Sequence, residues 1–182
     1  MGLDMYLDKE IYIGAEYEHN HIHGTIDLFS GDKKIDVDLS KVSTITERSA
    51  YWRKANAIHN WFVDNVQEGK DDCGRHYVSR DDMQNLLDTI NKVLESIVLE
   101  DGELVNGYSF QNGKETPMIE KGKVIKDSSV AEQLLPSASG FFFGNTDYNE
   151  WYVDDLKYTK EVLESILAKE EDKGSYYYQS SW

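Results

Sequence analysis

The chain has 182 residues, enough for a sizeable hydrophobic core, and we expect residues 1–182 to form one domain. Its 34 acidic residues outnumber its 19 basic ones and give a formal net charge of −15, which disfavours long nucleic acids as partners because phosphate binding depends on Lys and Arg. Cys73 is the single cysteine, and the acidic first ten residues suit neither a signal peptide nor a membrane span, so we expect a cytosolic protein.

The N-terminal quarter of the chain has the pattern of β-strands. Between Leu3 and Thr46, apolar residues mostly alternate with polar ones, and "SGDKK" at 30–34 is typical of a turn. The spacings are too short for the helical crossovers that parallel strands require. The sequence therefore predicts an N-terminal antiparallel β-meander of three or four strands.

The period changes to a helical one after Glu47. Apolar residues then recur at helical offsets, which predicts a helix from about Ser49 to Glu68 that ends at Gly69. A second helix is expected from about Ser79 to Ile97, because Ser79 and Asp82 form a capping-box pattern before a continuous apolar stripe.

The second half of the chain mixes turn signals with two further helices. The dipeptides Asn-Gly at 106–107 and 112–113 predict a small hairpin, and "SSVAEQLLP" predicts a short helix that ends before Pro136. A long helix is expected to begin near Thr146, and residues 172–182 form either a flexible tail or a late edge strand. The predicted class is α+β, with the meander packed against three or four helices.

The segment "YWRKANAIHNWF" at 51–62 is the strongest candidate for a binding site. It combines aromatic rings, cations and amides without a carboxylate, in a chain that is otherwise strongly acidic. Flat rings can stack on a planar ligand, while cations and amides can hold its anionic and polar edges. The opposing interpretation is a set of ordinary surface cations and a hydrogen-bonded core histidine. The predicted ligand-binding residues are Tyr51, Trp52, Arg53, Lys54, Asn56, His59, Asn60 and, from "GFFFG" at 140–144, Phe142.

Three other segments carry groups with possible chemistry. His19, His21 and His23 occupy every second position, so on a strand they would share a face. Every second residue of a strand lies about 6.6–7 Å from the next, however, so three such side chains rarely converge on one metal ion. The two aspartates beside Cys73 argue for a packed turn over a nucleophile. "GFFFG" favours a core strand over a ligand wall or subunit contact. No established catalytic motif occurs, and we expect a protein without cofactor or enzymatic activity.

Four blocks of sequence resemble a widespread family of small proteins encoded by phages and prophages. They are "MGLDMYL" at the N-terminus, "YWRKANAIHNWFVDNVQ", "DDCG" before "YVSRDDM", and "LLPSASGFFFG" before "DYNEWYVDDL". The resemblance covers nearly the whole chain and implies action in the host cytoplasm. Proteins of this kind that lack catalytic motifs include sponges that sequester the nucleotide signals of bacterial immunity.

Together these features predict a homo-oligomeric, dimeric or tetrameric protein that binds a small anionic nucleotide without cleaving it. The ligand would be a cyclic dinucleotide or an ADP-ribose derivative, and no membrane is involved. Two alternatives stay open: an acidic interaction protein that inhibits a host factor, and a metal-dependent hydrolase built on the three histidines.

Overall fold

The structure, a computed structural model, describes residues 2–14, 26–111, 113–140, 143–170 and 172–182. It has an α+β fold with antiparallel sheets, as the sequence predicts. No described helix is long and apolar enough to cross a membrane. The strands are β1 (Asp4–Tyr12), β2 (Leu28–Ser30), β3 (Lys33–Ile35), β4 (Thr44–Arg53), β5 (Arg75–Val78), β6 (Leu99–Gln111), β7 (Lys114–Ile125) and β8 (Ser175–Ser181), and the helices are α1 (Asn56–Asn65), α2 (Arg80–Ser96), α3 (Ser129–Leu134) and α4 (Glu150–Leu167).

The main sheet joins strands from both ends of the chain, in the order β4-β1-β8-β5. The predicted meander is therefore wrong in its connections: β1 pairs with β4, while β2 and β3 form a separate hairpin around the predicted turn at 30–34. The predicted frayed tail or edge strand at 172–182 is also wrong, because β8 lies inside the sheet between β1 and β5. Pairing between residues so distant in sequence leaves no local pattern.

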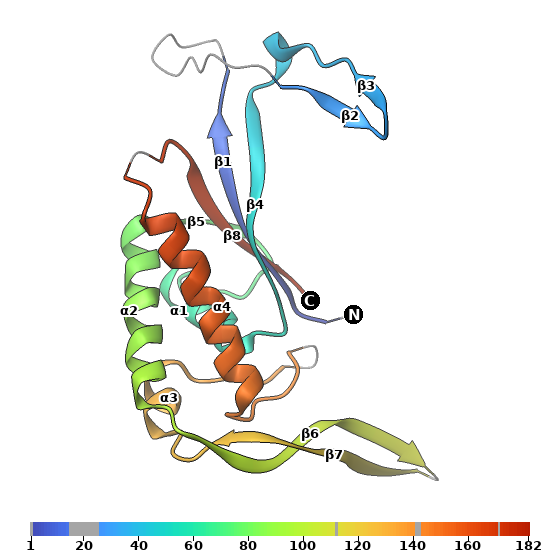
Figure 1. Cartoon of the computed structure of the whole chain (residues 1–182), viewed down its shortest axis with the longest axis vertical. Coiled ribbons are helices and arrows are strands. Elements are labelled where there is room, and N and C mark those ends of the chain that lie inside the picture. Colours follow the sequence, from blue (N-terminus) through green and yellow to red (C-terminus); the bar gives the residue numbers. More distant parts are fainter. Residues whose placement is uncertain (1, 15–25, 112, 141–142, 171) are drawn as a thin grey trace.

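Helices α1, α2 and α4 cover one face of this sheet (Figure 1). In β8 and in the paired segments 4–7 and 50–53, every second side chain points towards the helices and is buried. The register places Met5 opposite Trp52 and Leu7 between Ala50 and Tyr178, and these side chains join apolar residues of the helices in one core. The side chains between them point away from the helices.

The predicted helix from Ser49 to Glu68 is wrong in its first third. Strand β4 continues to Arg53, because residues 50–53 pair with residues 4–7 of β1, and α1 begins at Asn56. Ala50 and Trp52 are buried while Tyr51 is 43% exposed, which is the alternation of a strand. The apolar residues between 50 and 58 fit both periods, and tertiary pairing decides between them.

The other predicted elements are mostly confirmed. Helix α2 begins with the predicted capping box, in which Ser79 Oγ accepts from the Asp82 N–H and the Asp82 side chain accepts from the Ser79 N–H. Helix α3 ends before Pro136. Helix α4 starts later than Thr146, because Asn149 caps it by accepting from the N–H groups of Trp151 and Tyr152.

Strands β6 and β7 form a long hairpin that extends away from the rest of the molecule (Figure 1). The predicted small hairpin is thus confirmed in kind and exceeded in length. "GFFFG" was expected to be a core strand. Residues 141 and 142 lie outside the described residues, and Phe143 is half-buried and belongs to no strand.

Candidate functional site

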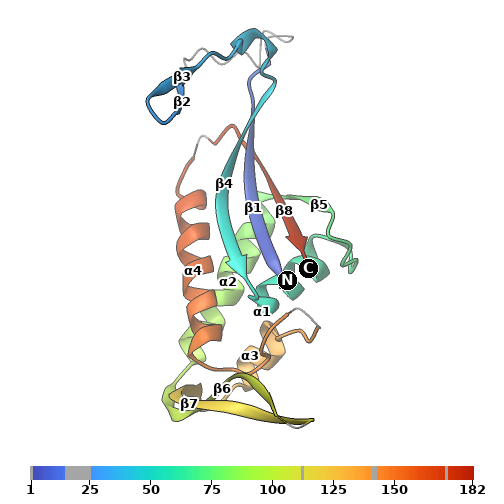
Figure 2. The same cartoon turned by 90° about the vertical axis from the view of Figure 1, so that its right-hand side faces the viewer.

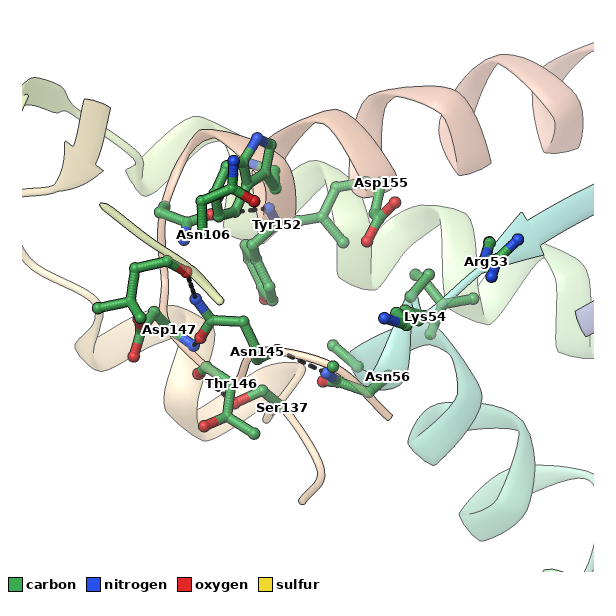
Figure 3. A pocket seen from close by; sticks show the side chains of 18 of the residues that line it. Arg53, Lys54, Asn56, Asn106, Ser137, Asn145, Thr146, Asp147, Tyr152 and Asp155 are labelled. Carbon is green, nitrogen blue, oxygen red and sulfur yellow. Dashed lines mark hydrogen bonds between the residues drawn. The ribbon is translucent and has the colours of Figure 1, made fainter. Parts of the chain in front are cut away.

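A cavity of about 730 Å³ lies where four parts of the chain meet (Figure 3). Its walls are the junction of β4 and α1, the middle of β6, the loop before α4, and the first turns of α4. This volume falls within the range of about 300–1,000 Å³ that small-molecule sites occupy. The cavity is therefore the main candidate site among the described residues.

Lys54 lines the cavity from a strained turn. Its backbone has a φ of +61°, in the left-handed region, where its N–H donates to Leu3 O at 2.8 Å and its carbonyl accepts from Asn56 N at 2.8 Å. A non-glycine residue pays about 1–2 kcal/mol for this conformation. The stem of Lys54 passes Gly144, where a Cβ would come within 3.1 Å of it. Strain at a position where glycine would fit points to a use for the side chain.

Arg53 stands beside Lys54 at the end of β4. Both side chains are exposed and line the cavity. Within the described part of the chain, no carboxylate lies within ion-pair distance of either group. In a chain with a net charge of −15, two neighbouring cations without an acidic partner offer a local site for an anion.

Asn56 builds the wall of the cavity. Its Nδ2 donates to the carbonyls of Phe143 at 3.1 Å and Asn145 at 2.8 Å, and its Oδ1 accepts from Ala138 N at 3.1 Å. The side chain is buried, and these three bonds tie both ends of the 138–145 loop to the start of α1. The amide of Asn56, a predicted ligand-binding residue, thus bonds to the loop.

Two exposed aromatic rings line the cavity from separate elements, beside the buried Tyr152. Tyr108 on β6 is 58% exposed, and Trp151 in the first turn of α4 is 36% exposed. Asn106 also lines it, and its Nδ2 donates to Glu120 across the hairpin at 3.1 Å. Exposed rings that border a cavity can stack on a planar group.

One carboxyl group of the cavity has an unusual protonation equilibrium. Burial, aided by the neighbouring charge of Asp154, raises the pKa of Asp155 to about 7. Asp155 projects from α4 and Lys54 from the β4–α1 turn, and the two line neighbouring parts of the wall (Figure 3). Near neutral pH this carboxyl can therefore be either a hydrogen-bond donor or an anion.

The other predicted ligand-binding residues lie elsewhere. Trp52 is buried and its Nε1 donates to Thr159 Oγ1 at 2.9 Å. His59 is 1% exposed between the Tyr178 hydroxyl, at 2.7 Å from Nδ1, and Asp71, at 3.1 Å from Nε2. This geometry fits the opposing interpretation, in which His59 is a hydrogen-bonded core histidine.

Two further members of the predicted set, Tyr51 and Asn60, do not line the cavity. The Tyr51 hydroxyl donates to Asp4 on the opposite face of the sheet, and Asn60 Nδ2 donates to Asp64 at 3.2 Å on α1. Phe142 lies outside the described residues. Of the eight predicted residues, the structure brings Arg53, Lys54 and Asn56 together at the cavity.

Sequence reasoning missed the residues that the cavity draws from the second half of the chain. They come from segments separated by up to a hundred positions, so no local pattern links them to Lys54. The Asn106-Gly107 dipeptide was the one available signal, and it was used only to predict a turn. The missed polar and aromatic lining residues are Asn106, Tyr108, Ser137, Asn145, Thr146, Asp147, Asn149, Trp151, Tyr152 and Asp155.

Neither of the other sequence candidates forms a site in the described structure. His19, His21 and His23 lie outside the described residues, and among those described no cluster of His, Cys, Asp and Glu is arranged to hold a metal ion. Cys73 is half-buried in a turn with a φ of +55°, and the neighbouring His76 bonds to Asp72 at 3.1 Å.

Comparison of the chain with protein-family models, curated proteins and solved structures gives no match.

Proposed function

We propose that the protein binds a small anionic nucleotide, such as a cyclic dinucleotide or an ADP-ribose derivative, in the cavity beside Lys54. The observation that carries this proposal is that Arg53 and Lys54, which have no carboxylate partner among the described residues, share one cavity with the exposed rings of Tyr108 and Trp151. A nucleotide needs both features, because its phosphate is anionic and its base is flat and aromatic.

In this arrangement the phosphate lies against Arg53 and Lys54, and the base reaches towards Tyr108 and Trp151. Arg53 can present a planar pair of N–H donors, while Lys54 supplies a compact charge. The volume of about 730 Å³ is large enough for a nucleotide and far too small for a folded nucleic acid.

We further propose that the ligand is held and not cleaved. Polar groups of the wall are largely engaged in holding the backbone: Ser137 Oγ donates to Thr146 O at 2.8 Å, and the Tyr152 hydroxyl donates to Leu135 O at 2.9 Å. Sequestration of an immune signal in the host cytoplasm, by a protein of phage origin, is the role that such binding would serve.

A second candidate function rests on Asp155. A carboxyl with a pKa near 7 in a cavity has the protonation behaviour of a general acid or base, so hydrolysis of the bound nucleotide is the rival outcome. Incubation of the protein with cyclic and linear nucleotides, followed by denaturation and chromatography, separates the two. Intact ligand supports sequestration; product that disappears in Asp155→Asn shows an enzyme.

Calorimetric titration of the same nucleotide panel tests the site. Arg53→Ala removes a charge-assisted hydrogen bond worth about 1.5–3 kcal/mol, so we expect affinity to fall about 10- to 150-fold. Arg53→Lys should restore part of the loss, because it keeps the charge without the planar fork. Lys92→Ala, on the exposed side of α2, makes the same change in net charge away from the cavity and serves as the control. Equal affinity in wild type and Arg53→Ala would eliminate this site.

A further inference from the structure

The face of the main sheet that points away from the helices is left uncovered by every described element (Figure 2). Its side chains are those that alternate with the buried ones. Tyr77 is 59% exposed and Tyr51 is 43% exposed, whereas Val78 and Trp52 beside them are buried. The rings of Tyr6 and Tyr177 lie half-buried between them, on β1 and β8.

The tyrosines of this face are held in place by arginines. The Arg48 guanidinium lies 4.1 Å from the Tyr6 ring centroid and its Nε contacts Asp8 at 2.5 Å. At the opposite edge of the same face, the Arg75 guanidinium lies 4.0 Å from the ring centroid of Tyr177.

Further contacts extend each of these two groups. Arg75 Nη1 is 2.7 Å from Glu10 Oε1. The rings of Tyr6 and Tyr51 are 5.5 Å apart, and those of Tyr77 and Tyr177 are 5.9 Å apart. The face is thus preorganised, with rings whose rotamers are already restricted by neighbours, which lowers the entropy cost of binding a partner.

The charges of this face cancel, unlike those of the chain as a whole. Three acidic and three basic side chains occupy the outward positions of the four paired strands: Asp4, Asp8, Glu10, Arg48, Arg75 and, at the end of β4 where it also borders the cavity, Arg53. The net charge of −15 therefore resides on the rest of the molecule. Two copies can approach through this face without the repulsion that their other surfaces impose.

We propose that this sheet face, centred on Tyr6, Tyr51, Tyr77 and Tyr177, binds the same face of a second copy of the chain in a two-fold symmetric dimer. Tyr and Arg are the residues enriched at protein interfaces and among their energetic hot spots, and Lys is absent from this face. A single-stranded nucleic acid could also stack on such rings, but Arg48 and Arg75 are already paired with carboxylates and the chain repels phosphates.

The size of the face sets the expected strength of the dimer. Four strands about 4.8 Å apart and about seven residues long give a face of roughly 450 Å², so two faces bury roughly 900 Å², at the low end for specific interfaces. The dimer should therefore be weak and reversible, and a single charged substitution at one of its four tyrosines should dissociate it.

Sedimentation equilibrium from about 1 to about 500 µM protein tests the proposal over the range in which weak interfaces dissociate. The wild type should shift from 21.0 kDa to twice that mass. Tyr77→Glu should raise the concentration of half-dissociation at least tenfold. The matched control is Phe29→Glu on the β2–β3 hairpin, where Phe29 is 60% exposed, and it should dimerise like the wild type. Thermal melting checks that both variants fold.

Three results would overturn the proposal. One is a wild-type protein that stays at 21.0 kDa throughout the concentration range. Another is a dimer that Tyr77→Glu leaves intact, or that Phe29→Glu dissociates equally well. The last is that the monomer binds a single-stranded oligonucleotide and that Tyr77→Glu abolishes this binding, which would assign the face to nucleic acid.

Discussion

Replacement of Lys54 by glycine should separate binding from stability. Lys54 holds a left-handed backbone with a φ of +61°, which costs about 1–2 kcal/mol for a residue with a Cβ and nothing for glycine. Glycine in turn loses about 0.5–1 kcal/mol more backbone entropy on folding. The two effects nearly offset, so Lys54→Gly should leave the free energy of unfolding unchanged or raise it by about 1 kcal/mol.

In a chain of this length, such a gain corresponds to a rise of about 2–4 °C in the melting temperature. The same substitution removes the ammonium group from the cavity, so affinity for the anionic ligand should fall by at least about tenfold. Lys54→Ala is the companion variant, because it removes the amine but keeps the strained backbone. It should bind as weakly as Lys54→Gly and melt below it.

Thermal melts and calorimetric titration measure the two quantities independently. A fall of more than about 1 kcal/mol in the stability of Lys54→Gly would show that the side chain itself supports the fold. Ligand affinity equal to that of the wild type in both variants would contradict the assignment of Lys54 to the site.

Three further predictions follow from buried polar contacts. The carboxylate that Asn56→Asp introduces cannot donate to the carbonyls of Phe143 and Asn145, so the free energy of unfolding in urea melts should fall by about 2–4 kcal/mol. The control Asn85→Asp, at an exposed position of α2, should change it by less than about 0.5 kcal/mol. Trp52→Phe removes the bond to Thr159 and should lose about 1–3 kcal/mol; an unchanged melt would contradict the role of that bond. Burial raises the pKa of Asp155 from 3.8 to about 7, so the folded chain keeps a proton that the unfolded chain releases, and stability should fall as pH rises through this window. Asp155→Asn should flatten that fall, and an equally steep pH profile in the variant would refute the assignment.

Features that depend on neighbours in sequence could be predicted without the structure. The capping box of Ser79 and Asp82 joins residues three positions apart, and the apolar stripe of α2 repeats at every turn, so both are readable from a short window. The turn at 30–34 and the close pairing of Gln111 with Lys114, which ends β6 and begins β7, are local in the same sense.

The segment 49–55 shows where local reasoning fails. Its apolar residues satisfy a helical and an extended period equally well, and the choice is made by β1, which pairs with it from nearly fifty positions away. His59 was likewise assigned to a ligand because its partners, Tyr178 and Asp71, could not be anticipated from the helix that carries it.

The sequence by itself determined the α+β class and most helix positions, and it singled out Arg53 and Lys54, which the structure places at the cavity. Only the tertiary structure decided that β8 lies inside the sheet between β1 and β5, that the Asn56 side chain bonds to a loop, and that Tyr108, Trp151 and Asp155 share a cavity with Lys54. The physical reason is that helix periodicity and capping are interactions between near neighbours, whereas strand order and cavity walls arise from contacts between segments that only the folded chain brings together.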